Sequence, residues 1–226
     1  MSFISIFDVL GPNMVGPSSS HTAGACSIAL LARKMLGEPA REVEFILYGS
    51  FAKTYKGHGT DRALLGGIMG FSTDDVRIPE AYTLAGQNHI AWRFIPNETE
   101  TDIHPNTVDI HLTGVSGKKV SLRGESIGGG KIRIARINDI EVDFSGEYDT
   151  LIVVHRDCIG MAAHITSCLS EGLVNIAFMK LFREARGDIA YSIVEFDGTL
   201  PETTLQRIKE KKDVNNVMTI QIQEGR

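Results

Sequence analysis

The chain has 226 residues, of which 42% are hydrophobic and 23% are charged, with a formal net charge of −5 and a pI of about 5.8. This is the composition of a globular protein, and nothing in its acidic balance suggests a face for nucleic acid or anionic lipid. No apolar run approaches the roughly 18–20 residues that cross a bilayer, and residues 1–12 lack the basic region of a secretory signal. Three unpatterned cysteines argue against a disulfide framework, so we expect a cytoplasmic protein without nucleic-acid or membrane partners.

The stretch "GPNMVGPSSSHTAGA" (11–25) places hydroxyls and one imidazole directly before an apolar, periodic segment. That segment, "SIALLARKMLG" (27–37), predicts an amphipathic helix closed by glycine. Unpaired N–H groups and the positive dipole end make a helix start an anion site, and hydroxyls add donors. Simple capping by Ser20 or Thr22 is the alternative, but one cap leaves the other groups unexplained. We expect a ligand site whose residues are Ser18, Ser19, Ser20, His21 and Thr22.

Residues 42–48 predict a strand rich in β-formers, residues 49–59 a loop bounded by glycines, and residues 60–70 a second helix with Thr60 as its N-cap. The glycine pair at 66–67 weakens this helix, so we expect close backbone packing there.

The sequence "KGHGTD" (56–61) contains a second candidate site residue, His58. Its flanking glycines let a substrate approach the backbone, and an imidazole at a helix start suits a general base or acid. A surface loop histidine is the alternative. Gly59, Thr60 and Asp61 are expected to contact the ligand beside it.

From about residue 90 the apolar period changes to two, which predicts strands around 108–112, 132–134 and 140–144, with "SIGGGK" as a flexible loop. In "HPNT" (104–107), His104 and Asn106 are candidates for the same polar site, although turn chemistry also explains that stretch. The remaining histidines lack ligand spacing, so no zinc site is expected.

A boundary is expected near 145–149, giving two domains, 1–147 and 148–226. The second domain shows the order β-α-β-β-α-β, which is the ferredoxin-like arrangement, so the fold class is α+β. Asp157 and Gly160 precede its first helix and Asn175 opens its second strand. These three residues are candidates for binding a small amino acid as an effector, with local turn and cap duties as the alternative for Asp157.

Together, "SIFDVLGPNMVGPSSSHTAGA", "YKGHGTDRALLGGIMG", "HPNT" and "ESIGGGKI" closely resemble the β subunit of bacterial iron–sulfur L-serine dehydratase. The C-terminal domain resembles an ACT domain, the small amino-acid-sensing module. The N-terminal domain resembles the allosteric substrate-binding domain of some D-3-phosphoglycerate dehydrogenases. Asp157 stands where some serine-binding relatives have Asn, which leaves the effector open.

The resemblance implies a two-chain lyase in which a partner α chain carries a [4Fe–4S] cluster and this chain binds no metal. The three cysteines here lack ferredoxin spacing, although their count alone does not exclude an open cluster. A cluster iron would polarise the hydroxyl of L-serine, His58 would remove the Cα proton, and the products would be pyruvate and ammonia. Self-association through the ACT domain is also expected.

Two other functions compete with this one. A pyridoxal-phosphate dehydratase needs a Schiff-base lysine and a large cofactor domain, for which 1–147 is short. A non-catalytic amino-acid-sensing subunit, like the regulatory end of phosphoglycerate dehydrogenase, is the alternative from another class.

Overall fold

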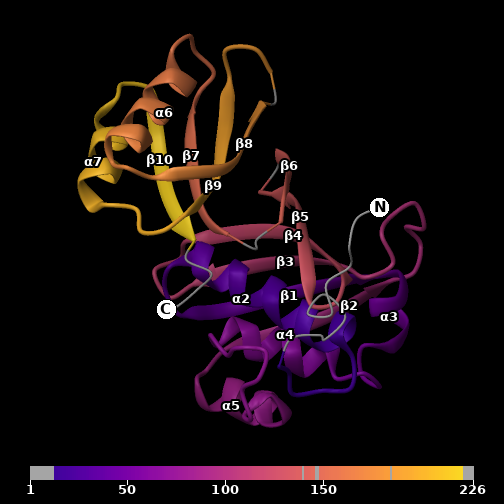
Figure 1. Cartoon of the computed structure of the whole chain (residues 1–226). Coiled ribbons are helices and arrows are strands. Elements are labelled where there is room, and N and C mark those ends of the chain that lie inside the picture. The colour runs from indigo at the N-terminus through magenta and orange to yellow at the C-terminus, as the bar shows by residue number, and fades with distance from the viewer. Residues whose placement is uncertain (1–12, 139, 146–147, 184, 221–226) are drawn as a thin grey trace, which may run out of the picture. The chain divides into compact units, whose positions relative to one another are not determined.

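The computed structural model describes residues 13–138, 140–145, 148–183 and 185–220 (Figure 1). The chain divides into two compact units, Met1–Asp139 and Ile140–Arg226. Two predictions from the sequence fall on residues outside the described ranges. They are the domain boundary after residue 147, which adjoins positions 146–147, and the lack of a secretory signal in residues 1–12.

The first sheet has six strands in the order β2-β1-β3-β4-β5-β6, with β2 parallel to β1 and β3 to β5 antiparallel to their neighbours. Between β1 and β2 the chain forms α3, α4, η2 and α5. The elements are η1 (Ser19–Gly24), α2 (Ala25–Leu36), β1 (Ala40–Tyr48), α3 (Gly49–Thr54), α4 (Thr60–Ile68), η2 (Ile78–Glu80), α5 (Ala81–Gln87), β2 (Ala91–Asn97), β3 (Thr107–Gly114), β4 (Lys119–Gly128), β5 (Lys131–Ile137) and β6 (Ile140–Phe144).

Helix α2 confirms the expected amphipathic helix: its predicted apolar residues are buried and Gly37 closes it in the left-handed region. It packs on β3 and β4 and against α4 (Figure 1). The close packing expected at the glycine pair of α4 is confirmed at Gly67. A Cβ there would lie 2.5 Å from the Cys26 carbonyl oxygen, so only glycine lets the two helices approach this closely.

Three local predictions are wrong. Residues 49–54 form the short helix α3 rather than loop, because Phe51 is buried and the Pro105 carbonyl accepts from Ser50 N and Phe51 N. Gly59, at φ 70°, takes the cap position of α4, so Thr60 lies inside the helix instead. The "SIGGGK" stretch is not a loose loop, since β4 continues to Gly128 and β5 resumes at Lys131 after a two-residue turn.

The C-terminal unit confirms the predicted β-α-β-β-α-β order and the α+β class. Its four-stranded sheet has the order β10-β7-β9-β8, and helices α6 and α7 cover one face. Buried residues of the sheet and the helices, such as Val153, Ile165 and Val194, form one core. The elements are β7 (Asp149–Arg156), α6 (Met161–Glu171), β8 (Asn175–Arg183), β9 (Ile189–Asp197), α7 (Glu202–Glu210) and β10 (Val214–Ile220).

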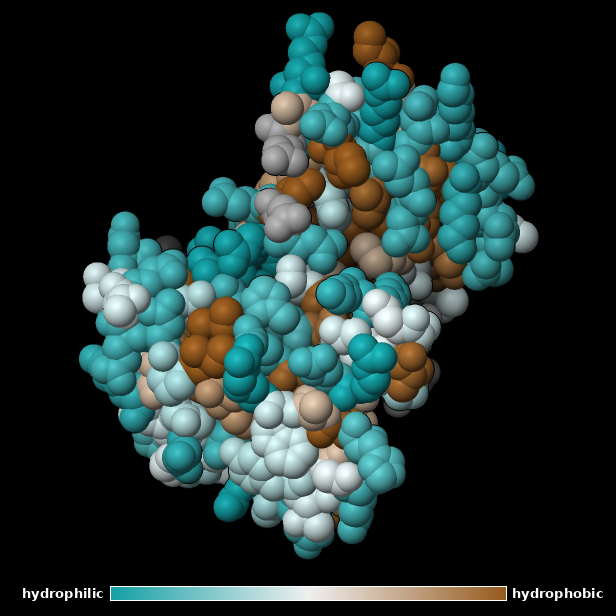
Figure 2. All heavy atoms as spheres, turned by 180° about the vertical axis from the view of Figure 1, so that it is seen from behind, coloured by the Kyte–Doolittle hydropathy of each residue, from teal (hydrophilic) through white to brown (hydrophobic). Residues whose placement is uncertain are grey.

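The surface in Figure 2 is largely hydrophilic, with apolar side chains showing between polar ones on the upper, C-terminal unit. Exposed apolar residues of that unit include Phe178 and Leu181 on strand β8 and Ile189 on β9. Among the described residues, no helix combines the length and apolarity that crossing a membrane requires.

Candidate functional site

The serine-rich segment forms a π-helix, η1, that continues directly into α2. Its cap is Ser18, whose hydroxyl accepts from the backbone N–H of His21 at 3.1 Å, and not Ser20 or Thr22 as the alternative from sequence proposed. π-Helical turns are rare and occur often at functional sites. Ser18 performs the capping, whereas the Ser20 hydroxyl lies against the His21 ring and the Thr22 hydroxyl donates to the His58 carbonyl.

His21 lies between two hydroxyls. Ser20 Oγ is 3.1 Å from its Nδ1, and Ser50 Oγ at the start of α3 is 2.9 Å from its Nε2. Burial, and secondly the neighbouring His58, lower the pKa of His21 below its ordinary value. The ring is therefore neutral at pH 7, with one nitrogen donating and the other accepting.

His58 lies beside His21, with ring centroids 4.8 Å apart and planes at 66°. Its side chain is exposed, and its backbone is fixed on both sides: His58 N donates to the Thr54 carbonyl at 3.0 Å, and Thr22 Oγ1 donates to the His58 carbonyl at 3.2 Å. The structure thus joins the two loops that the sequence singled out separately, and it leaves the His58 imidazole open to solvent.

The "HPNT" loop joins the same site through α3. Ser50 N donates to the Pro105 carbonyl at 2.6 Å, so the residue that contacts His21 also contacts this loop. Asn106 and Ser126 then hold each other: Ser126 N donates to the Asn106 carbonyl at 2.9 Å, and Asn106 Nδ2 donates to the Ser126 carbonyl at 3.4 Å.

Asp61 has two hydrogen bonds of its own. Its Oδ1 accepts from Arg62 N at 2.8 Å and its Oδ2 accepts from the Tyr82 hydroxyl at 2.7 Å. Burial and this bond raise the pKa of Tyr82, so the phenol stays protonated and keeps donating. Asp61 is buried and fixes the first turn of α4, while the expected contact between Asp61 and a ligand stays a prediction.

The structure brings together five residues that the sequence predicted for the site: Ser18, Ser20, His21, Thr22 and His58. Asn106 is connected to them through the Ser50–Pro105 contact. Sequence reasoning missed Ser50 and Ser126. The available signals were a serine after the glycine that follows β1 and a serine two residues before the three glycines of "ESIGGGKI".

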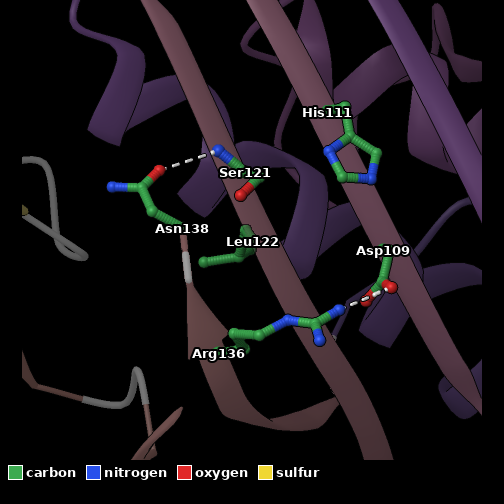
Figure 3. Close-up of a pocket in the computed structure, with 6 residues that line it drawn as sticks. All are labelled: Asp109, His111, Ser121, Leu122, Arg136 and Asn138. Carbon is green, nitrogen blue, oxygen red and sulfur yellow. Dashed lines mark hydrogen bonds and ion pairs between the residues drawn. The ribbon is translucent and has the colours of Figure 1, made fainter. Parts of the chain in front are cut away.

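A second polar cluster lies on the sheet face that bears Asp109 and His111, alternating with the apolar side chains Val108 and Ile110 of β3. Figure 3 shows a pocket of about 290 Å³ there, with Arg136 reaching toward Asp109 and Asn138 bonded to Ser121 N. The pocket is lined by Asp109, His111, Ser121, Leu122, Arg136 and Asn138.

The Asp109 carboxylate in this pocket is buried and fully engaged. Arg123 binds both of its oxygens, at 2.6 and 2.7 Å, Arg136 binds Oδ2 at 2.9 Å, and the Tyr48 hydroxyl also donates to it at 2.9 Å. These bonds join β1, β3, β4 and β5, so we interpret the cluster as structural.

The three effector candidates do not meet within one copy of the C-terminal unit. Asp157 accepts from Arg183 Nη1 and Gly187 N, both at 3.0 Å, at the end of β8. These bonds, Gly187 first, hold the pKa of Asp157 below its usual value. Asn175 lies at the opposite end of β8, bonded to Asp197, while Gly160 caps α6.

The cysteines do not fit an iron–sulfur cluster in this chain. Cys26 is buried in α2, where desolvation raises the pKa of its thiol to about 12, and its Sγ contacts the Phe71 carbonyl. Cys158 and Cys168 belong to the other unit. Within the described ranges, no three His, Cys, Asp or Glu residues gather as a metal site would require.

Comparison with known proteins gives a consistent result. The family model for the serine dehydratase beta chain matches residues 2–91. The L-serine dehydratase beta chain of Peptoniphilus asaccharolyticus is 42% identical over 203 residues, covering 90% of this chain and 91% of that protein. The probable L-serine dehydratase beta chain of Bacillus subtilis is 38% identical over 220 residues, covering 97% and 99%. A D-3-phosphoglycerate dehydrogenase of Methanocaldococcus jannaschii is 25% identical, covering 85% of this chain and 36% of that enzyme.

Proposed function

The chain belongs to the L-serine dehydratase beta-chain family, and from that premise we propose that it is one subunit of an enzyme that converts L-serine to pyruvate and ammonia. The observation that supports this most is the pair of imidazoles formed by His21, in the serine-rich helix η1, and His58, which packs beside it from the turn before α4. This arrangement offers hydrogen-bond donors for a carboxylate and an adjacent group that accepts a proton.

The substrate carboxylate binds at the start of η1. The first turn of this helix carries backbone N–H groups and the hydroxyls of Ser19 and Ser20, which favours an anion. Holding the carboxylate there fixes the amino acid next to His58 and converts an encounter in solution into a fixed geometry.

His58 acts as the base. Its exposed imidazole takes the Cα proton of L-serine, and the electron pair of that C–H bond forms the Cα–Cβ double bond as hydroxide leaves Cβ. The resulting aminoacrylate tautomerises to an imine, which water hydrolyses to pyruvate and ammonia. Atoms balance without an oxidant or reductant.

The neutral state of His21 assists this step. A second positive imidazolium 4.8 Å away would oppose protonation of His58, because like charges repel at short distance. Burial and His58 itself keep His21 uncharged, and the Ser20 and Ser50 hydroxyls fix its ring. His21 is therefore a positioning residue in this proposal.

The partner of this chain is an alpha subunit, as the beta-chain designation of its relatives implies. We assign the [4Fe–4S] cluster to that partner, since the cysteines of the present chain do not fit one. Such a cluster would supply a Lewis acid for the substrate hydroxyl, while the residues of this chain bind the amino acid and accept its proton.

The test is anaerobic co-production of the chain with a serine dehydratase alpha chain, followed by iron and pyruvate assays with L-serine. The complex is expected to contain iron and to release pyruvate, whereas this chain alone is expected to be colourless and inactive. An isolated chain with a thiolate–iron absorption band, or a loaded complex that leaves L-serine unchanged, would contradict the proposal.

A further inference from the structure

Three buried side-chain polar atoms lack a hydrogen-bond partner among the residues that the structure describes. They are Thr60 Oγ1, Asn106 Oδ1 and Ser126 Oγ. Thr60 is two residues from His58, and Asn106 and Ser126 hold each other by backbone bonds. Leaving a buried polar atom unpaired costs stability, and native proteins seldom do so without a functional reason.

The position of Ser126 is imposed by close packing of η1 on β4. Ser126 is fully buried, and a Cβ added to Gly24 of η1 would lie 2.0 Å from its hydroxyl oxygen. Close packing of α2 on β4 also requires glycine, on the strand, because a Cβ on Gly124 of β4 would lie 2.3 Å from Ile28 of α2. The Ser126 hydroxyl thus lies directly against the helix that carries His21 and Thr22.

The pairing of β4 is disturbed immediately after this serine. The pairing of β4 with β5 is irregular between Ser126 and Gly128, and Ile127 between them is 52% exposed. Such bulges are found next to active sites, where they re-aim side chains. Here the bulge keeps Ser126 inward while its neighbour points to solvent.

We propose that Ser126 is a substrate-binding residue whose hydroxyl completes its hydrogen bonds only when an α-amino acid is bound. The inference rests on the proposed function, because it concerns the same site. An α-amino acid offers suitable partners to the two unpaired atoms that lie together: its carboxylate or hydroxyl oxygen would accept from Ser126 Oγ, and its ammonium would donate to Asn106 Oδ1.

The experiment compares Ser126→Ala with Ser192→Ala in the two-chain enzyme. Both serines are fully buried in strands, but Ser192 Oγ has a partner, His155 Nε2 at 2.9 Å, in the C-terminal unit. Two readouts are taken for each variant: KM for L-serine in the pyruvate assay, and the melting temperature of this chain alone.

Ser126→Ala is expected to raise KM by about 10- to 100-fold, the loss of one hydrogen bond to a charged group, with no fall in melting temperature. Ser192→Ala is expected to lower the melting temperature and leave KM unchanged. An unchanged KM for Ser126→Ala would overturn the inference, and so would a fall in melting temperature like that of the control, because the hydroxyl would then have a partner in the free protein. A wild-type complex inactive on L-serine would instead refute the proposed function.

Discussion

Replacing Gly24 with alanine tests whether the close contact between η1 and β4 shapes the site. Gly24 has ordinary helical angles, φ −60° and ψ −41°, so alanine is allowed by the backbone. The obstacle is space: the new Cβ would lie 2.0 Å from Ser126 Oγ and 2.8 Å from Ser126 Cβ. The next atom, the Ser19 carbonyl oxygen, is 3.6 Å away and does not collide.

Two opposing effects set the magnitude. Overpacking a core costs about 1–3 kcal/mol, whereas glycine to alanine within a helix gains about 1 kcal/mol. Gly24→Ala alone is therefore expected to destabilise by up to about 2 kcal/mol. In a Ser126→Gly background both colliding atoms are absent, so the same change is expected to stabilise by about 1 kcal/mol, a coupling of about 1–3 kcal/mol.

The assay is urea unfolding of the wild type, both single variants and the double variant. Gly86→Ala is the matched control, because Gly86 lies within helix α5 and an added Cβ there meets nothing within 4 Å. It is expected to stabilise equally in both backgrounds. If Gly24→Ala has the same effect with and without Ser126, the contact does not determine this packing and the reasoning fails.

Three further predictions concern the hydroxyls, the imidazole and the C-terminal unit. Ser20→Ala is expected to raise KM for L-serine at nearly unchanged stability. Ser18→Ala removes a helix cap and is expected to lower the free energy of unfolding by about 0.5–2 kcal/mol. If instead Ser20→Ala lowers stability and leaves KM unchanged, the Ser20 hydroxyl has only a structural role. Folding lowers the pKa of His21. As the pH falls through about 6.5, the unfolded chain therefore protonates His21 before the folded chain does, so the free energy of unfolding is higher above about pH 6.5 and decreases below it. His21→Asn is expected to shrink the difference in melting temperature between pH 7 and pH 5, and an undiminished difference would count against the neutral ring. Calorimetry of the full chain is expected to show an L-serine binding event at a dimer of the C-terminal unit, which Asn175→Ala removes while binding at the serine-rich helix persists, since Asn175 lies at one end of β8 and Asp157 is bonded to Arg183 at the other; a titration unchanged by Asn175→Ala would exclude Asn175 from an effector site.

Local patterns predicted most of the fold. The spacing of Ile28, Leu31 and Met35 and the glycine after them gave α2 nearly to the residue, because period and end signal agree there. The β-α-β-β-α-β order of the C-terminal unit was predicted correctly for the same reason, because its helices and strands also show clear periods and end signals. Helix α3 was missed because its first turn depends on the Pro105 carbonyl, more than fifty positions away in the sequence.

The site was only half predictable. Serines, histidines and glycines at two helix starts identified the segments of His21 and His58, because helix-start chemistry is local. Their approach to 4.8 Å is a property of the packed helices and was not visible in the spacing. Ser50 and Ser126 were missed because their roles depend on contacts with distant segments, the second made possible by the absence of a Cβ at Gly24.

The most direct test of the central claim is the kcat for pyruvate release from L-serine by the two-chain enzyme carrying His58→Ala. His111→Ala is the control, because it removes an exposed imidazole that lines the separate pocket on β3. With iron content and assembly intact in both variants, His58→Ala is expected to lose about 10²- to 10⁴-fold in kcat, and the control is expected to keep wild-type activity. A His58→Ala enzyme within about threefold of wild-type kcat, below the loss typical of a general base, would contradict the account.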